Sequence, residues 1–102
     1  MNQAPIAFIY ATPTAPVVWS LVTFDGGASY DPDGAMASYQ WDLDGNGTID
    51  QTGSTATQTF YMAGTYWVTL YVTDTAGAMS SRSLPLVVTA TSTPGMPAMG
   101  NV

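Results

Sequence analysis

The chemistry available to this chain lies in its aspartates. All seven acidic residues of the 102-residue sequence are Asp, the single basic residue is Arg82, and His, Cys and Lys are absent. Without these three residue types, neither the usual Ser and Cys triads nor thiolate metal sites can be assembled. Carboxylate oxygens are hard ligands, which favour Ca2+ over transition metals. The composition therefore points to cation binding, and we expect no enzymatic activity.

Two of the aspartates flank a proline in a loop. Asp31 and Asp33 stand on either side of Pro32, so their carboxylates can converge on one point. Neighbouring carboxylates repel each other unless a cation neutralises them. The alternative is that both side chains only accept hydrogen bonds from loop amides, as Asx residues commonly do.

A second acidic segment runs from Asp42 to Asp50. Its sequence, DLDGNGTID, follows the D-x-D-x-N-G-x-I-D opening of an EF-hand calcium loop. The twelfth position, where a bidentate Glu belongs, is Gly53, and neither flank is typical of a helix. We therefore favour a tight hairpin turn that is stabilised by its own Asp and Asn side chains, with Ca2+ binding as the alternative.

Charge and length limit the possible partners. A net charge of −6 argues against nucleic acid, because binding to the phosphate backbone requires Lys and Arg. The apolar runs are short and interrupted by Pro and Thr, so we expect no membrane insertion. No positive charge precedes an apolar stretch at the N-terminus, so no signal peptide is visible, and an exported form would be an excised mature domain. A chain of this length forms one domain with its own core.

The stretch from Gly64 to Asp74, GTYWVTLYVTD, predicts a long central strand. Its β-branched and aromatic residues alternate with a period of two, which places successive side chains on opposite faces. The inward face is predicted to hold Tyr66, Val68, Leu70 and Val72. Trp67 and Tyr71 then point outward, where a solitary domain would carry small polar side chains.

The rest of the chain predicts shorter strands separated by turns. The strands cover residues 6–11, 18–24, 36–43, 48–51, 54–60 and 79–89, and the last is an edge strand because it contains Pro85. Residues 91–102, rich in Pro, Gly, Ser and Thr, are typical of a tail or linker after a domain at residues 1–90. This pattern predicts an all-β, two-sheet β-sandwich of about seven strands. Its core is expected to include Tyr30, Tyr39, Trp41, Leu43 and Phe60.

Several segments give the chain a family resemblance. NQAPIA, FDGGASYDPDG, SYQWDLDGNG and GTYWVTLYVTD, followed by GAMSS and LVV, occur in the order and spacing of the PKD (polycystic kidney disease) domain over about residues 2–89. The chain thus resembles this family. The resemblance implies an immunoglobulin-like sandwich that is non-catalytic and belongs to a secreted or cell-surface protein. It also implies use as a spacer or as a site of protein or polysaccharide contact.

A calcium site is also implied by the resemblance. In the family fold, Asp74 lies at the same end of the sandwich as the Asp31 loop and the incoming N-terminal residues. Collagenase members of the family bind Ca2+ with this constellation. By resemblance, the expected ligands are Asp31, Asp33 and Asp74. A carbonyl or side chain of Asn2 or Gln3 would complete the shell.

The chain departs from the family in its outward-facing residues. Large apolar side chains replace the Thr or Ser that family members typically carry there, and several of them in register would form a contact patch. If the first two strands share a sheet, as in the family, Phe8 and Tyr10 lie beside Trp19 and Leu21. The predicted contact residues are Phe8, Tyr10, Trp19, Leu21, Trp67 and Tyr71.

Two kinds of partner suit such patches. Apolar residues on both outer faces favour structural assembly or protein–protein contact, with copies of this chain or with neighbouring domains, because a head-to-tail contact needs two different patches. The alternative is a spacer or polysaccharide-binding module of a secreted hydrolase or surface-layer protein, in which aromatic faces stack on sugar rings. A third possibility is that residues 91–102 or the loop at residues 12–16 cover part of the patches.

Overall fold

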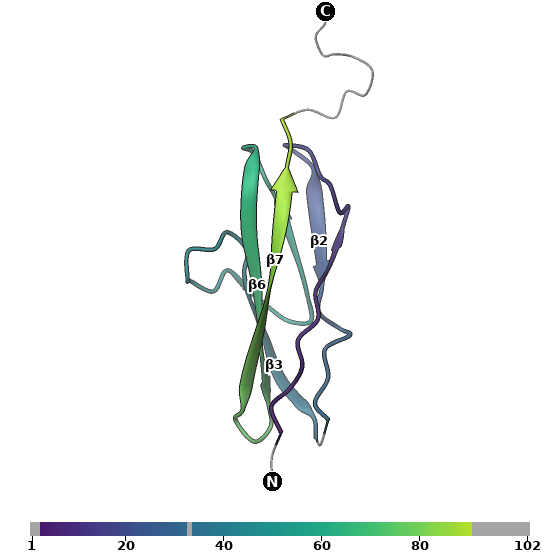
Figure 1. The fold of residues 1–102 in the computed structure, drawn as a ribbon, viewed down its shortest axis with the longest axis vertical. Helices are drawn as coiled ribbons and strands as arrows, with labels where there is room; N and C mark the ends of the chain where they lie inside the picture. The colour runs from purple at the N-terminus through teal and green to yellow at the C-terminus, as the bar shows by residue number, and fades with distance from the viewer. Residues whose placement is uncertain (1–2, 33, 91–102) are drawn as a thin grey trace, which may run out of the picture.

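A computed structural model describes residues 3–32 and 34–90 of the chain. These residues contain no helix that could cross a membrane, and they form seven strands in two sheets that pack face to face (Figure 1). One sheet has the order β1-β2-β5 and the other the order β4-β3-β6-β7, and all neighbours are antiparallel. The strands are β1 (Tyr10–Thr12), β2 (Leu21–Asp25), β3 (Met36–Asp42), β4 (Gln51–Thr52), β5 (Thr55–Thr59), β6 (Gly64–Asp74) and β7 (Met79–Val88). The predicted sandwich is confirmed.

The longest strand, β6, has the bounds that its sequence predicts. It pairs with β3 on one side and with β7 on the other, so it lies inside the four-stranded sheet. Val68, Leu70 and Val72 face the core and are fully buried. Each large apolar side chain removed from water in this way stabilises the fold by about 1.5–3 kcal/mol.

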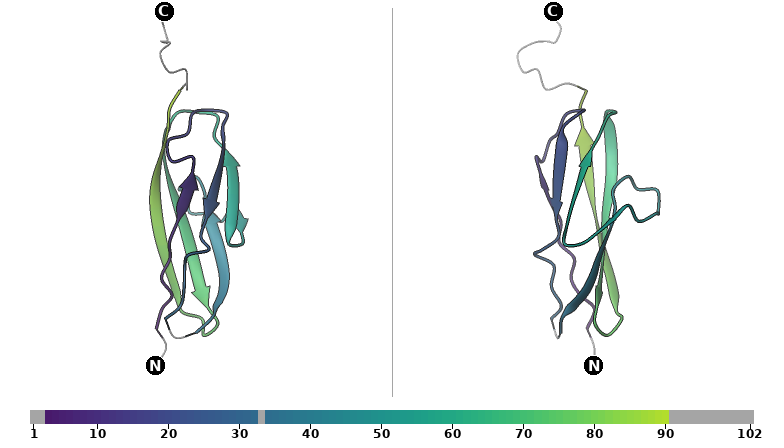
Figure 2. Two further views of the ribbon diagram at one scale, coloured as in Figure 1. Left: turned by 90° about the vertical axis from the view of Figure 1, so that its right-hand side faces the viewer. Right: turned by 180° about the vertical axis from the view of Figure 1, so that it is seen from behind.

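Trp41 of β3 lies at the centre of the core. Its ring centroid is 6.0 Å from that of Phe24, which belongs to the opposite sheet. Its indole Nε1 donates a hydrogen bond to the carbonyl oxygen of Gly53 at 2.8 Å, so the buried polar atom is satisfied. Figure 2 shows the two sheets facing each other across the interior of the molecule. The other buried apolar residues are Ala7, Val22, Phe24, Leu43, Ala56, Phe60, Val68, Leu70, Val72, Leu86 and Val88.

Tyr30 does not belong to the core, so that prediction is wrong. Its side chain is 49% exposed. Its backbone exchanges two hydrogen bonds with Ile6, of 2.7 and 3.0 Å, and its ring stacks on Phe8 with centroids 6.3 Å apart. Tyr30 therefore packs on the N-terminal segment outside the core.

Three strands differ in length or position from the prediction. The strand predicted at residues 18–24 is β2 at Leu21–Asp25, because Trp19 has a φ angle of 70° and cannot be part of it. The first strand is limited to Tyr10–Thr12, since Ile6 makes only an isolated bridge with Tyr30. The predicted return strand at residues 48–51 is instead β4 at Gln51–Thr52, because residues 42–50 form a long loop.

β7 is an edge strand, as Pro85 predicts. The N–H of Thr89, just after β7, donates to the carbonyl oxygen of Pro16 at 3.1 Å, on the side away from β6. Residues two apart along a strand direct their N–H groups to the same side, so Pro85 lies where β6 requires no donor. The predicted tail at residues 91–102 lies outside the described residues.

Candidate functional site

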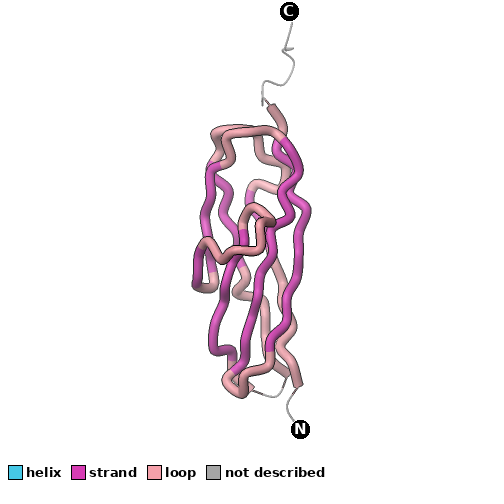
Figure 3. The backbone as a smooth tube through the Cα atoms, turned by 90° about the vertical axis from the view of Figure 1, so that its left-hand side faces the viewer, coloured by secondary structure: helices cyan, strands magenta, loops and turns pink. Residues whose placement is uncertain are grey.

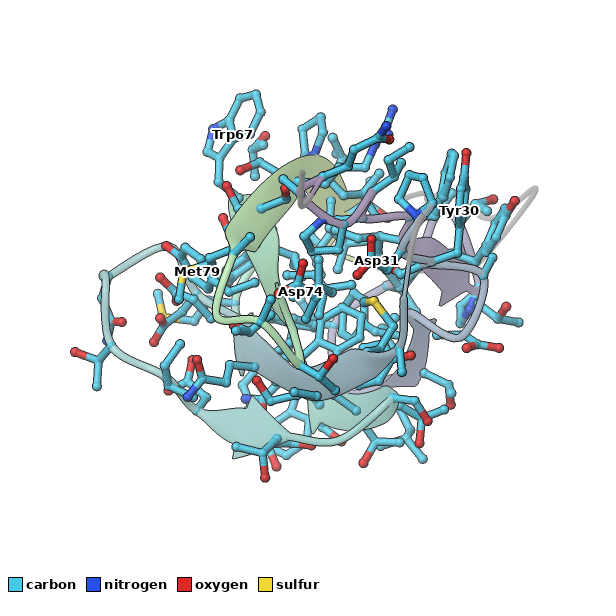
Figure 4. The ribbon with its side chains drawn as sticks, turned by 90° about the horizontal axis from the view of Figure 1, so that it is seen from below. Tyr30, Asp31, Trp67, Asp74 and Met79 are labelled. Carbon is cyan, nitrogen blue, oxygen red and sulfur yellow. The ribbon has the colours of Figure 1, made fainter. Side chains whose placement is uncertain are left out.

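The lower end of the sandwich in Figure 1 carries two of the predicted calcium ligands. Asp74 ends β6 and is only 2% exposed. Its Oδ1 accepts the N–H groups of Ala76 at 3.0 Å and Ala78 at 2.8 Å, which stabilises the turn into β7. Asp31 is half-buried on the loop after β2. Figure 4 looks onto this end and shows both residues there.

The backbone brings these two loops together. Met36 pairs with Asp74, and the N–H of Thr75 donates to the carbonyl oxygen of Ala35 at 3.0 Å. The common end that the resemblance implies for the Asp31 loop and Asp74 is therefore present. Carboxylates at this common end are the hard oxygen ligands that Ca2+ prefers.

The remaining predicted ligands are less well defined. Gln3 is exposed at the start of the described chain. Asn2 and Asp33 lie outside the described residues, so the ligand set as a whole stays a prediction.

The segment from Asp42 to Asp50, named here the acidic loop, brings three other carboxylates together. The ligand oxygens of Asp42, Asp44 and Asp50 all lie within 4.8 Å of one another. The loop projects from the side of the sandwich in the right-hand view of Figure 2, and Figure 3 shows it in front of the strands. It is the one group of three or more acidic residues that is close enough to share a cation among the described residues.

Hydrogen bonds explain the shape of the acidic loop. The buried Asp42 accepts the N–H of Gly45 at 2.9 Å through Oδ1 and that of Gly47 at 2.7 Å through Oδ2. Asp50 Oδ2 accepts the N–H of Leu43 at 2.8 Å. The two glycines have φ angles of 76° and 86°, in the region that favours glycine. The loop is therefore stabilised by its own Asp side chains, as predicted, but it is longer than the predicted tight hairpin turn, because residues 43–50 separate β3 from β4.

The environment of the acidic loop shifts two pKa values in opposite directions. Burial alone raises the pKa of Asp42, but the N–H of Gly47 and the hydrogen bond from Asp44 stabilise its carboxylate more, so the pKa lies below its ordinary value. Burial, together with the charges of Asp50 and Asp42, raises the pKa of Asp44. Backbone N–H groups thus offset part of the negative charge of Asp42.

The predicted contact residues of the three-stranded sheet form two groups: Tyr10 on β1, and Leu21 at the start of β2 with Trp19 just before it. Tyr10, Leu21 and Trp19 are exposed. β1 and β2 share the sheet, as expected, but Tyr10 lies opposite Asp25, four residues along β2 from Leu21. At about 3.4 Å per residue this separation exceeds a side-chain contact, so Tyr10 does not lie beside Leu21. That part of the prediction is wrong.

Phe8 belongs to neither exposed group. It is half-buried between Tyr30, whose ring stacks on it, and Arg82, whose guanidinium lies over its ring. Its expected outward exposure is therefore reduced by two contacts from distant parts of the chain.

The outer face of the four-stranded sheet carries Trp67, which is 56% exposed and points away from the sandwich in Figure 4. Tyr71 shares this face but is half-buried. The cross-strand register adds Val87 and Met79 of β7, both exposed, to the same face. We name Trp67, Tyr71, Val87 and Met79 the Trp67 face.

A further aromatic site was not predicted from the sequence. Tyr61 and Met62, between β5 and β6, are both exposed. The Tyr61 ring lies edge-on to Trp19, with centroids 4.6 Å apart and planes at 72°. A groove of about 260 Å³ runs from these residues to Asp44 of the acidic loop. The available signal was the pair Tyr61-Met62 in a turn, where polar residues are the rule.

Comparisons with known proteins agree with this geometry. A model of the PKD domain family matches residues 2–89. Collagenase ColA of Clostridium perfringens is 33% identical over 88 residues, which cover 86% of this chain and 8% of the collagenase.

Solved structures show the same fold. One, described as the structural basis for the promiscuous specificity of carbohydrate-binding modules from the β-sandwich superfamily, has a TM-score of 0.80 and 40% identity over 88% of this chain and 36% of its own. The PKD1 domain of the Vibrio cholerae metalloprotease PrtV has a TM-score of 0.71 and 33% identity over 86% of this chain and all of its own.

Proposed function

Because this chain belongs to the PKD domain family, we propose that it is a non-catalytic module of a larger protein outside the cell, either secreted or at the cell surface. Domains of this family are generally non-catalytic accessory modules. The chain spans 8% of the collagenase that it resembles and matches the PKD1 domain of a metalloprotease, which supports a place beside a separate catalytic domain. The absence of His, Cys and Lys supports the same role.

The module contacts a protein or a polysaccharide through its exposed aromatic side chains. The observation that carries this proposal is the exposure of Trp19 and Trp67, at 73% and 56%, on two different faces. Desolvated aromatic anchors are where the energy of an interface concentrates. Similarity to a structure of carbohydrate-binding modules adds polysaccharide to the candidate partners.

Adsorption to insoluble polymers tests this function. The chain is mixed with fibrillar collagen, cellulose and chitin, and the free fraction is measured after sedimentation. We expect saturable adsorption to at least one polymer, no release of soluble fragments, and loss of adsorption in the double variant Trp19→Asn, Trp67→Thr. Equal adsorption by parent and variant would show that the exposed aromatics do not make the contact.

Self-association is a second candidate, and the Trp67 face favours it. Trp67, Val87 and Met79 leave apolar surface open along the outer side of β6 and β7. A second copy of the chain that covered this face would remove these side chains from water, at about 1.5–3 kcal/mol for each large one. The module would then serve in structural assembly.

The proposal includes Ca2+ as an ion that stabilises the folded domain. Asp31, Asp33 and Asp74 would hold it, with Asn2 or Gln3 as further oxygen donors. Support comes from the shared position of Asp31 and Asp74 at one end of the sandwich and from the burial of Asp74. Ca2+ there would neutralise carboxylates that otherwise repel one another.

A further inference from the structure

Trp19 has a backbone conformation that is unusual for its side chain. Its φ angle is 70°, and it is the one described non-glycine residue with a positive φ. Bulky residues rarely adopt this region, and such outliers cluster where a side chain has a function. Backbone hydrogen bonds hold this conformation. The N–H of Trp19 donates to the carbonyl oxygen of Phe60 at 2.7 Å, and the N–H of Val18 donates to the carbonyl oxygen of Thr89 at 2.9 Å.

The conformation presents two aromatic rings to solvent. The Trp19 side chain is 73% exposed and that of Tyr61 is 57% exposed. Their edge-to-face contact, at 4.6 Å, limits the orientation of both rings. A platform of this kind is ready for a flat, partly apolar ligand without further ordering of its side chains.

A groove continues from this platform to the acidic loop. Its volume of about 260 Å³ lies just below the range of about 300–1,000 Å³ that is typical of small-ligand pockets. It is lined by Asp44, Gln58, Thr59, Phe60, Tyr61, Met62 and Tyr66. The hydroxyl of Tyr66 donates to the carbonyl oxygen of Met62 at 2.6 Å, which holds the rim in place.

The groove also has polar side chains, those of Asp44, Gln58 and Thr59. The carboxylate of Asp44 is kept in position by the N–H of Asn46 at 3.2 Å and its Nδ2 at 3.3 Å. A carboxylate accepts hydrogen bonds, whereas the amide of Gln58 both accepts and donates them. Aromatic faces beside such acceptors match a pyranose ring, which has apolar C–H faces and hydroxyl groups at its edge.

We propose that this groove binds a neutral polysaccharide, with one sugar ring between Tyr61 and Asp44 and the chain continuing over Trp19. The inference rests on the proposed contact function and narrows it to one ligand class and one site. The negative charge of the site favours neutral over anionic polysaccharides. Asp42, Asp44 and Asp50 lie close together in the acidic loop, and the net charge of the chain is −6. Anionic polysaccharides are therefore repelled.

Native affinity electrophoresis of the whole chain tests the site. Hydroxyethylcellulose, laminarin and glycol chitin are the probes, with alginate as the anionic control. Asn is the replacement for Trp19 because Asn tolerates a positive φ. We expect retardation by at least one of the three probes and not by alginate. Trp19→Asn and Tyr61→Ser should weaken it by about tenfold or more, as for interface hot spots, while both variants keep the melting profile of a folded domain.

Tyr30→Ser is the matched control for Tyr61→Ser, since Tyr30 is also an exposed tyrosine, at 49% against 57%, and it stacks on Phe8 outside the groove. Its retardation should equal that of the parent. If Tyr30→Ser abolishes retardation and Trp19→Asn and Tyr61→Ser do not, the groove is not the site, although the contact function stands. If collagen adsorbs the parent but no neutral polysaccharide retards it, the proposed polysaccharide site is wrong and the proposed contact function remains. If neither binds, both proposals fail.

Discussion

The guanidinium carbon of Arg82 lies 5.2 Å from the centre of the Phe8 ring. The same side chain donates from Nη1 to the carbonyl oxygen of Ala7 at 3.2 Å. The single basic residue of the chain therefore joins β7 to the segment that precedes β1. This side chain therefore links the four-stranded sheet to the segment that leads into the three-stranded sheet.

Removal of this link should destabilise the fold moderately. Arg82→Met eliminates a cation–π contact, worth about 0.5–1 kcal/mol at an exposed site, and a hydrogen bond worth about 0.5–1.5 kcal/mol. We expect the free energy of unfolding to fall by about 1–2 kcal/mol in urea denaturation. In a Phe8→Leu background the same substitution should cost less. An equal cost in both backgrounds would show that the ring contact contributes nothing.

Trp41→Ala should cost much more. The substitution leaves a cavity beside Phe24 and removes the donor to Gly53, and large aromatic truncations cost about 3–5 kcal/mol. Trp41→Phe, which keeps most of the apolar contact and loses only the N–H, should lie between this variant and the parent. Differential scanning calorimetry measures both. A Trp41→Ala variant that melts at the temperature of the parent would contradict the central position of this residue.

The longest strand, β6, was predictable because its pattern depends on neighbouring residues alone. The alternation of Val68, Leu70 and Val72 determines which side of β6 faces the core, whatever the partner strand. The edge position of β7 was predictable from Pro85 alone, since a residue without an N–H cannot lie between two strands.

Contacts between distant segments could not be predicted in the same way. Tyr30 resembles a core residue in the sequence, but the bridge to Ile6 places it outside the core. Trp19 and Tyr61, whose rings are in contact, are 42 residues apart in the sequence, and no periodicity relates them. The acidic loop was predictable in outline, because the hydrogen bonds between its aspartates and its backbone all lie within nine consecutive residues.

Calcium should raise the melting temperature of the parent. A ligand that binds only the native state stabilises it by about 2.7 kcal/mol at a concentration of 100 times Kd. Asp31→Asn should abolish the rise, and Asp44→Asn should leave it intact. The reverse pattern would place the ion in the acidic loop. A parent whose melting is the same in Ca2+ and in chelator would exclude a stabilising ion.

Self-association should depend on the Trp67 face. The double variant Trp67→Thr, Tyr71→Thr places polar side chains on the outer face of β6 without changing a core residue, so it should stay folded. Light scattering over a range of concentrations should show a larger mass for the parent than for the variant. A parent that remains monomeric at the highest concentration would remove assembly from the possible functions.

The backbone of Trp19 gives a stability prediction of its own. A left-handed conformation costs an L-residue roughly 1–2 kcal/mol, and glycine escapes this cost because it lacks Cβ. Trp19→Gly and Trp19→Ala both lose the contact with Tyr61, so the difference between them isolates the backbone term. We expect the glycine variant to unfold with a free energy about 1 kcal/mol higher than the alanine variant. A more stable alanine variant would show that residue 19 does not hold a positive φ in solution, and that the platform with Tyr61 is not preformed.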